Sequence, residues 1–239
     1  MSPAHQEING ANGHSNGGLQ FDTIEDSVNA FARGEFVIVL DDASRENEGD
    51  LICAAEDCTP EMMGFMLRYT SGYVCVPMTD ERADQLELPH MVTKNRDPHL
   101  TAYTVTVDGL GPSTTTGISA FDRSCTVNML ADPTVTPSKL RRPGHVLPLR
   151  AKPGLTRERR GHTEAAVELC RLAGKQQVGV ICEVVIHGEP VPGRAELSGS
   201  RMARRDDCLA LGKQFGVKVC TIEDMTKYVE EREGKLQNQ

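Results

Sequence analysis

Short apolar runs alternate with segments of helical periodicity along most of the chain, and this pattern predicts a mixture of strands and helices. The runs with the length and residue types of strands cover residues 36–40, 51–55, 74–77, 103–107, 178–186 and 217–220. Helical periodicity marks residues 120–130, 163–173, 201–215 and 222–230. We therefore predict an α+β fold, a single domain in which a mixed β-sheet is flanked by helices.

Two helices near the N-terminus carry capping signals. Thr23 and Asp26 have the spacing of a capping box ahead of an apolar segment. Thr59 and Pro60 read as an N-cap followed by a first-turn proline, and Gly72 is a stop signal for the same helix. We expect one helix to begin at each of these positions.

The ends of the chain and two internal stretches lack regular patterning. Residues 1–20 are rich in Gly, Asn and Ser, and we expect a flexible tail there. A single domain is expected over 21–232, followed by a frayed tail at 233–239. The irregular stretches 89–100 and 132–156 are too long for simple connections, so we expect them to carry function.

Composition and charge exclude several classes of protein. The 34 acidic residues exceed the 26 basic ones, and aromatic residues make up only 4% of the chain, which disfavours a nucleic-acid partner. No apolar run approaches the ~20 residues of a membrane span, and no secretory signal is visible. The eight cysteines form no C-x-x-C pair. We expect a cytoplasmic protein with reduced cysteines and no membrane partner.

Residues 41–50, DDASRENEGD, place five carboxylates and Arg45 between two apolar strands. Mg²⁺ prefers oxygen ligands and needs only one or two protein carboxylates when a substrate completes its shell. Arg45 would hold a substrate oxygen or orient a carboxylate. The segment therefore predicts a site for a hard cation, with a solvated acidic turn as the alternative.

Residues 155–164, LTRERRGHTE, open a predicted helix and contain three arginines. Backbone N–H groups at a helix start attract anions, and nearby arginines strengthen that attraction. We therefore expect this segment to bind a phosphate. His162 at the same edge is a candidate metal ligand or proton carrier. A basic patch with an N-cap threonine is the alternative.

Two further side chains are candidates for proton transfer. His145 lies among prolines and a glycine, where we expect a rigid turn to display it. Glu183 lies inside the apolar run 178–186, and a buried carboxylate there is either paired or functional. The alternatives are that His145 is an ordinary surface histidine and that Glu183 faces solvent at a strand edge. The hydroxyl-rich loop 113–117 is a weaker candidate for anion binding.

A divalent metal, a phosphate pocket and two proton-transfer groups together predict an enzyme that acts on a small sugar phosphate through enediol chemistry. Six motifs carry a family resemblance: DDASRENEGDL (41–51), SGYVCVPMT (71–79), TTTGISAFDR (114–123), RPGHVLPLRA (142–151), GHTEAAVEL (161–169) and GVICEV (179–184). In these motifs and their order, over most of residues 23–230, the chain resembles the 3,4-dihydroxy-2-butanone 4-phosphate synthases of riboflavin biosynthesis. RENEGD, RPGHV and GHTEA together make a chance match negligible.

The resemblance implies a Mg²⁺-dependent lyase, with Mn²⁺ as a substitute ion, that converts D-ribulose 5-phosphate to 3,4-dihydroxy-2-butanone 4-phosphate and formate. It implies an α+β homodimer with active sites near the subunit interface. The implied metal ligands are Glu46 and His162. The implied contacts to the sugar are Arg45 and Asp50. The implied phosphate contacts are Arg159, Arg160, Gly161 and Thr163. The implied acid–base groups are His145, Glu183 and Asp50. The residues expected close to the site are Asp42 and Cys75.

The phosphate-binding arginine is left open by the sequence. The family has Arg-Gly-Gly-His-Thr at this point, whereas here Arg160 replaces one glycine. Counting back from His162 selects Arg159, and counting forward from Thr156 selects Arg157.

Alternatives also exist for the activity and for the chain's organisation. A Mg²⁺-dependent sugar-phosphate isomerase or aldolase would release no formate, and a phosphometabolite sensor would bind without turnover. Bifunctional relatives carry a GTP cyclohydrolase domain after this region, and with the chain ending at residue 239 we expect a monofunctional enzyme. The segment 192–199 is longer than in many relatives and is expected to be a surface loop.

Overall fold

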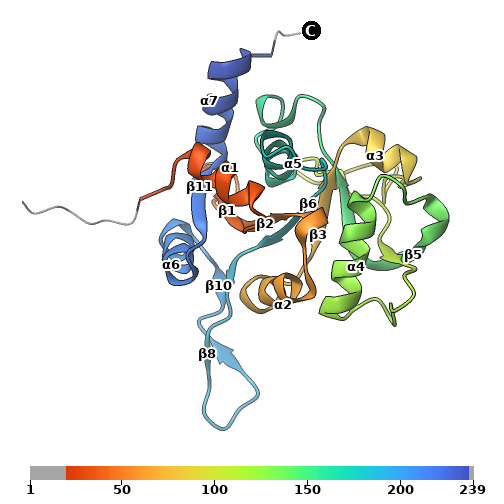
Figure 1. The fold of residues 1–239 in the computed structure, drawn as a ribbon. Coiled ribbons are helices and arrows are strands. Elements are labelled where there is room, and N and C mark those ends of the chain that lie inside the picture. Colours follow the sequence, from red (N-terminus) through yellow and green to blue (C-terminus); the bar gives the residue numbers. More distant parts are fainter. Residues whose placement is uncertain (1–19, 237–239) are drawn as a thin grey trace, which may run out of the picture.

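A seven-stranded mixed sheet forms the centre of the molecule (Figure 1). The computed structural model describes residues 20–236. In spatial order the strands are β11 (Lys218–Thr221), β1 (Val37–Leu40), β2 (Gly49–Ala54), β6 (Gly179–Glu183), β3 (Cys75–Met78), β5 (Leu140–Arg150) and β4 (Val107–Gly109). β1 is parallel to β11 and β3 to β5, while the other neighbours are antiparallel. The predicted α+β class with a mixed sheet is confirmed.

Helices cover both faces of this sheet (Figure 1). One face carries α1 (Ile24–Ala32), α5 (His162–Leu172) and α7 (Ile222–Glu233), and the other carries α2 (Pro60–Tyr69), α4 (Ala120–Ala131) and α6 (Arg205–Phe215). The side chains of β1 alternate between the two cores, because Val37 and Val39 pack on the α5 side and Ile38 and Leu40 on the α2 side. A strand that is buried on both faces has a continuous apolar sequence, so β1 could be predicted from the sequence.

The predicted capping signals are confirmed at the two helix starts. The Thr23 hydroxyl accepts a hydrogen bond from the Asp26 N–H at 3.1 Å, and α1 begins at the next residue after Thr23. The Thr59 hydroxyl accepts from the Met62 N–H at 3.2 Å, with Pro60 in the first turn of α2. Each cap satisfies a backbone donor that the helix itself leaves without a partner.

The stretch 132–156 was expected to be irregular, and this prediction is wrong. It contains β5, which pairs in parallel with β3 and places Leu147 opposite Cys75. The prolines of this strand masked it in the sequence, because proline has no N–H to donate to a sheet. Pro148 instead contributes its carbonyl oxygen, which accepts from the Thr104 N–H at 3.0 Å. His145 therefore lies on a strand rather than on a turn.

The long run 178–186 is divided into two strands. β6 ends at Glu183, and β7 (Val185–Ile186) pairs with β10 (Arg201–Met202) outside the main sheet. The expected helix 201–215 consequently begins only at Arg205. Beyond β7, a hairpin of β8 (Glu189–Pro190) and β9 (Leu197–Ser198) projects from the domain (Figure 1).

Three other boundaries differ from the predictions. The helix α3 (Asp80–Gln85) was not predicted, although Thr79 caps it. The expected strand 103–107 is reduced to two isolated bridges, Tyr103 with Leu149 and Thr104 with His90, and to the first residue of β4. α7 continues to Glu233, so fraying from residue 233 is wrong at that position. The remainder of the predicted tails, residues 1–19 and 237–239, lies outside the described residues.

Candidate active site

One polar pocket lies on the sheet face that α5 covers, where four neighbouring strands present alternate residues to the same side. The residues that line it from β2, β3, β5 and β6 are Asp50, Cys75, Leu149, Ile181 and Glu183. Asp50 and Glu183 are register partners on adjacent strands, so the two carboxylates face the pocket side by side. The loop 41–48, the start of α5, Arg159 and the segment 101–103 form the rest of the wall.

The loop 41–48 is folded around the carboxylate of Asp41, which is buried at the end of β1. One Asp41 oxygen accepts from the Glu48 N–H at 2.8 Å. The other accepts from the Glu46 N–H at 3.0 Å and from the Arg45 guanidinium at 2.9 Å. Asp41 thus directs Glu46 and Arg45 toward the pocket. The sequence placed Asp41 in the acidic segment without giving it a role.

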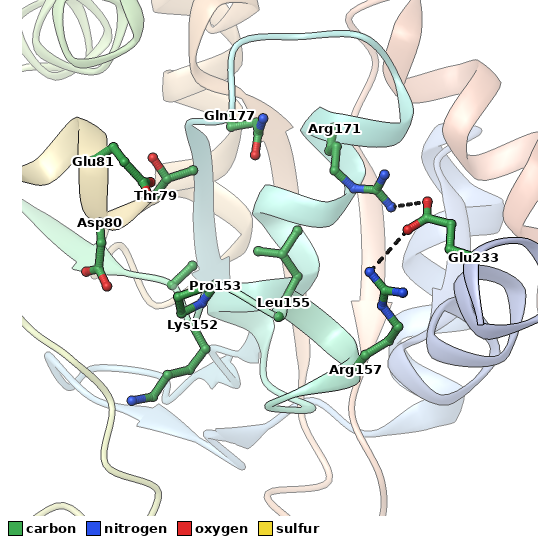
Figure 2. A pocket seen from close by; sticks show the side chains of 12 residues that line it. Thr79, Asp80, Glu81, Lys152, Pro153, Leu155, Arg157, Arg171, Gln177 and Glu233 are labelled. Atoms are coloured by element: carbon green, nitrogen blue, oxygen red, sulfur yellow. Dashed lines mark hydrogen bonds and ion pairs between the residues drawn. The ribbon is translucent and has the colours of Figure 1, made fainter. Parts of the chain in front are cut away.

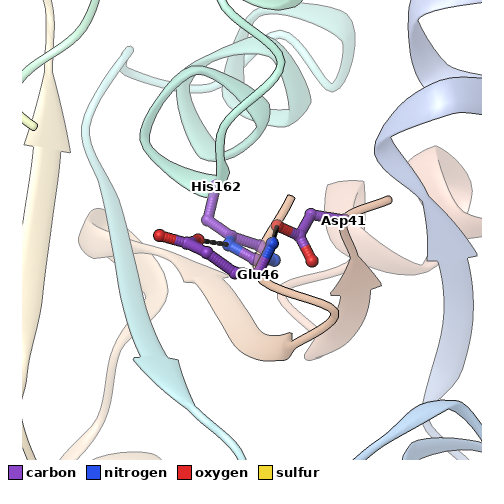
Figure 3. Close-up of side chains that lie close together, drawn as sticks. All are labelled: Asp41, Glu46 and His162. Carbon is purple, nitrogen blue, oxygen red and sulfur yellow. Dashed lines mark hydrogen bonds and ion pairs between the residues drawn. The ribbon is translucent and has the colours of Figure 1, made fainter. Parts of the chain in front are cut away.

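Asp41, Glu46 and His162 form a cluster that fits a metal ion (Figure 3). One ligand atom from each lies within 4.8 Å of the others. The His162 Nδ1 atom is 3.9 Å from a Glu46 oxygen and 3.7 Å from the Asp50 Oδ1 atom. Asp50 Oδ1 and His162 Nε2 are buried and have no hydrogen-bond partner among the described residues. Such buried polar atoms normally have partners, and carboxylate oxygens beside an imidazole suit Mg²⁺.

The charges of the pocket also favour a cation. Burial, reinforced by the negative charges of Glu183 and Glu46, raises the pKa of Asp50 well above its usual range. Burial and the charge of Glu46 raise the pKa of Glu48. Burial lowers the pKa of His162, which keeps its imidazole neutral and able to coordinate. A divalent ion would therefore relieve repulsion among carboxylates that the fold holds together.

The start of α5 has the features of an anion site at one end of the pocket. Its N-cap is Gly161, which supplies no side-chain cap, and the first two helical residues, His162 and Thr163, line the pocket. Arg159 lines the same wall, held by the buried Glu164 at 2.5 Å and by the Thr101 hydroxyl at 3.1 Å. A side chain at Gly161 would overlap the Arg159 guanidinium.

The structure distinguishes the three arginines that the sequence could not. Arg159 lines the pocket. Arg157 points to the end of α7, where its guanidinium contacts Glu233 at 3.1 Å. Arg160 is exposed and does not line the pocket. The geometry therefore favours Arg159 as the contact to an anion.

Glu183 is held at the end of β6 rather than left at a free strand edge. Its carboxylate accepts from the Ser71 hydroxyl at 2.7 Å, and its carbonyl accepts from the Ser71 N–H at 2.8 Å. The charge of Glu183, together with burial, also raises the pKa of the Cys75 thiol in the same wall. Glu183 thus has a fixed orientation toward the pocket.

His145 and Asp42 do not join this pocket within one chain. The His145 Nδ1 atom is 2.9 Å from an Asp108 oxygen, and the His145 N–H donates to the other Asp108 oxygen at 2.8 Å. The His145 side chain is 40% exposed, so it faces outward from β5. Asp42 is exposed and accepts from the Ser44 N–H at 2.7 Å.

The weak anion candidate at 113–117 is a structural turn in this chain. Thr115 donates to the Asp122 carboxylate through both its N–H and its hydroxyl, each at 2.8 Å. Gly117 donates to the same carboxylate at 3.2 Å. The turn is therefore organised around an anion that the chain itself supplies.

Sequence reasoning missed the residues that approach the pocket from the stretch 89–104. The His99 Nε2 atom is 3.7 Å from a Glu46 oxygen, and the His99 carbonyl accepts from Arg159 at 3.2 Å. Thr101 and Tyr103 line the pocket. The length of the irregular stretch 89–100 was the available signal, but it identified a region and no single residue.

Comparisons with known proteins agree with this geometry. Residues 25–228 match the family model described as 3,4-dihydroxy-2-butanone 4-phosphate synthase. A synthase of that name from Pyricularia oryzae is 59% identical over 217 residues, which cover 91% of this chain and 93% of the relative. The Saccharomyces cerevisiae synthase is 47% identical over 87% of this chain and 99% of its own length. A crystal structure of such a synthase with two magnesium ions has a TM-score of 0.89 at 60% identity, and the match covers 90% of this chain and 100% of that one. The chain belongs to the 3,4-dihydroxy-2-butanone 4-phosphate synthase family.

Proposed function

We propose that this protein is a Mg²⁺-dependent lyase of riboflavin biosynthesis that converts D-ribulose 5-phosphate to 3,4-dihydroxy-2-butanone 4-phosphate and formate. One observation carries the proposal. The same pocket wall combines the Asp41–Glu46–His162 cluster and the adjacent Asp50, which carry buried atoms without hydrogen-bond partners among residues 20–236, with a helix start that has no side-chain cap beside Arg159. A sugar phosphate is the ligand that needs both features at once, since its oxygens suit the cluster and its phosphate suits the helix start.

Binding begins with the phosphate at the start of α5. The N–H groups of the first helical turn and the guanidinium of Arg159 receive it, with the Thr163 hydroxyl as a further donor. Arg45, anchored by Asp41, directs its remaining N–H groups to the sugar. Glu46 and His162 would hold Mg²⁺, and its Lewis acidity would ease the loss of a carbon-bound proton from the sugar.

Proton transfer is assigned to the groups that surround the sugar. Glu183, oriented by Ser71, carries a proton to or from the substrate carbon skeleton. Asp50, its register partner, contacts a sugar hydroxyl. One hydroxyl leaves as water, the skeleton rearranges, and rehydration precedes cleavage to formate. The water lost is therefore regained, and the five-carbon substrate yields a four-carbon product and formate without net consumption of water.

We assign the second acid–base group, His145, to the site of a neighbouring subunit. Asp108 fixes its Nδ1 atom and leaves the outer ring nitrogen directed away from β5. Within one chain His145 does not line the pocket, so a homodimer with sites near its interface brings His145 of the partner subunit to the substrate. Mixed dimers of His145→Ala and Glu183→Gln chains should recover activity at one of two sites.

We also propose a cytoplasmic location and a small molecule as the principal ligand. All eight cysteines are free, and seven of them are buried, which suits a reducing compartment. No helix among residues 20–236 is long and apolar enough to cross a membrane. The net charge of −8 disfavours a nucleic-acid partner.

Formate release is the test of the activity. The purified protein is incubated with ribulose 5-phosphate and Mg²⁺, and formate is measured with and without EDTA. The proposal expects metal-dependent formate, with Mn²⁺ able to replace Mg²⁺. Substrate loss without formate would support an isomerase or aldolase, and binding without consumption would support a sensor.

A further inference from the structure

A second pocket lies beside the segment 154–161 and shares no lining residue with the candidate active site (Figure 2). On one side of it, Glu233 at the end of α7 lies between two arginines. One Glu233 oxygen is 3.1 Å from Arg157 of the 3₁₀ turn η3 (Leu155–Arg157), and the other is 2.7 Å from Arg171 of α5. Arg157 also donates to the Gly234 carbonyl at 3.0 Å. One carboxylate thus ties η3 and α5 to the end of α7.

The same network continues into the core. Arg171 donates to Glu168 at 2.8 Å, and Glu168, only 1% exposed, accepts from the Thr156 hydroxyl at 3.0 Å. Thr226 of α7 reaches the Thr156 carbonyl at 3.4 Å. Thr226 and Glu233 are about two helical turns apart and therefore share one face of α7. α7 therefore contacts η3 through Thr226 at one end of this face and through Glu233 at the other.

The segment held in this way leads directly to the phosphate site. The Leu155 carbonyl accepts from the Glu158 N–H at 3.0 Å and from the Arg159 N–H at 2.9 Å. The Gly161 N–H donates to the Arg159 carbonyl at 3.0 Å. Because these bonds make a tight turn, a displacement of η3 moves the backbone of Arg159 and the N-cap of α5.

We infer that Glu233, acting through Arg157 and Arg171, is a positioning residue for recognition of the substrate phosphate. This inference rests on the proposed function, in which Arg159 and the start of α5 bind that phosphate. Anion recognition depends on donor placement to within about 0.5 Å, so a clamp on the neighbouring turn affects affinity more than it affects the chemical step. Glu233 is 35% exposed, and solvent screening limits the effect to a modest one.

The test compares Glu233→Gln with Glu231→Gln. The first change removes both ion pairs and keeps the side-chain size. The second removes one charge from an exposed position on the same helix, and Glu231 forms no ion pair within residues 20–236. We expect Glu233→Gln to raise the KM for ribulose 5-phosphate about three- to tenfold while kcat changes less than about twofold. The dissociation constant of inorganic phosphate, measured by calorimetry, should rise by the same factor, and Glu231→Gln should match the wild type.

A double variant separates positioning from a general loss of structure. If Arg157 and Glu233 act together, Arg157→Gln combined with Glu233→Gln should raise KM no further than the larger single effect. A lower Tm with unchanged KM and unchanged phosphate affinity would overturn the inference, and so would equal effects of the two glutamine variants. Phosphate binding needs no turnover, so a wild type that binds phosphate and releases no formate would refute the proposed activity while the clamp is still tested. A wild type that releases formate but does not bind inorganic phosphate would overturn the inference and leave the proposed activity standing.

Discussion

Asp50 and Asp122 are both almost fully buried, with 2% and 1% of their surfaces exposed, but their surroundings differ. Hydrogen bonds from the Thr115 backbone and hydroxyl lower the pKa of Asp122 to about 2, with further bonds from Ser119 and Gly117. One buried Asp50 oxygen has no hydrogen-bond partner in the described part of the chain, and burial together with the charge of Glu183 raises the pKa of Asp50. One carboxylate is satisfied by its own turn, whereas the other is held among like charges.

The comparison distinguishes a buried carboxylate that stabilises the fold from one that serves a binding site. A buried carboxylate with several donors stabilises the turn that surrounds it. A buried carboxylate without donors destabilises the empty site and is retained where a ligand supplies the missing partners. Asp122 therefore belongs to the stability of the region 115–122. Asp50 lines the pocket together with Glu183 and His162, and we propose that it acts in the chemistry there.

Glu183→Gln should remove most of the activity and leave the fold intact, a loss equal in size to that expected for Asp50→Asn. The amide keeps the shape of the side chain and the contact with Ser71 but cannot carry a proton, so formate production should fall about 10²–10⁴-fold. Circular dichroism and Tm should remain close to wild type, since the fold does not depend on this charge. Full activity of the folded variant would remove Glu183 from the catalytic groups.

Gly161→Ala should have a smaller effect, directed at substrate binding. The added methyl would overlap the Arg159 guanidinium and displace it from the pocket wall. We expect the KM for ribulose 5-phosphate to rise about tenfold, the size of one lost charge-assisted contact. Gly64→Ala is the control, because a methyl group at Gly64 meets no atom within 4 Å, and it should leave KM unchanged. Equal KM values for Gly161→Ala and Gly64→Ala would contradict the prediction that a methyl group at position 161 displaces Arg159.

The pH dependence of stability should give the smallest effect, and it tests the region around Asp122. A lowered pKa in the folded state means that Asp122 contributes stability above its unfolded pKa, near 3.9, and loses that contribution as the pH falls toward about 2. Asp122→Asn should therefore lower Tm at pH 7 by roughly 5 °C. The difference from wild type should shrink between pH 5 and pH 2, since both proteins then lack the charge. A constant difference over about pH 2–7 would show that Asp122 does not act through its charge.

The sequence predicted the parts of the site that are contiguous in the chain. The acidic segment 41–50 and the segment 155–164 carry their own local signals, namely crowded carboxylates and three arginines at a predicted helix start. The strands 36–40 and 51–55 were visible because burial on both faces leaves them wholly apolar. These segments supply the carboxylate–histidine cluster and the helix start that line the pocket.

The sequence could not predict the contacts that join distant segments. The Asp108–His145 pair forms only because β4 and β5 are neighbours, and the prolines of β5 concealed that strand. The ion pairs of Glu233 with Arg157 and Arg171 depend on how α7 packs, so the end of the chain was taken for a frayed tail. Long-range pairing of this kind has no local pattern that a single sequence reveals.

The most direct test of this account compares Asp50→Asn and Asp122→Asn for both formate release and Tm. The account predicts opposite outcomes for the two variants. Asp50→Asn should lose about 10²–10⁴-fold of its formate release and keep or raise its Tm in the absence of metal. Asp122→Asn should retain formate release within about threefold and unfold at a lower temperature. Wild-type formate release by Asp50→Asn, or a lower Tm for Asp50→Asn than for Asp122→Asn, would contradict it.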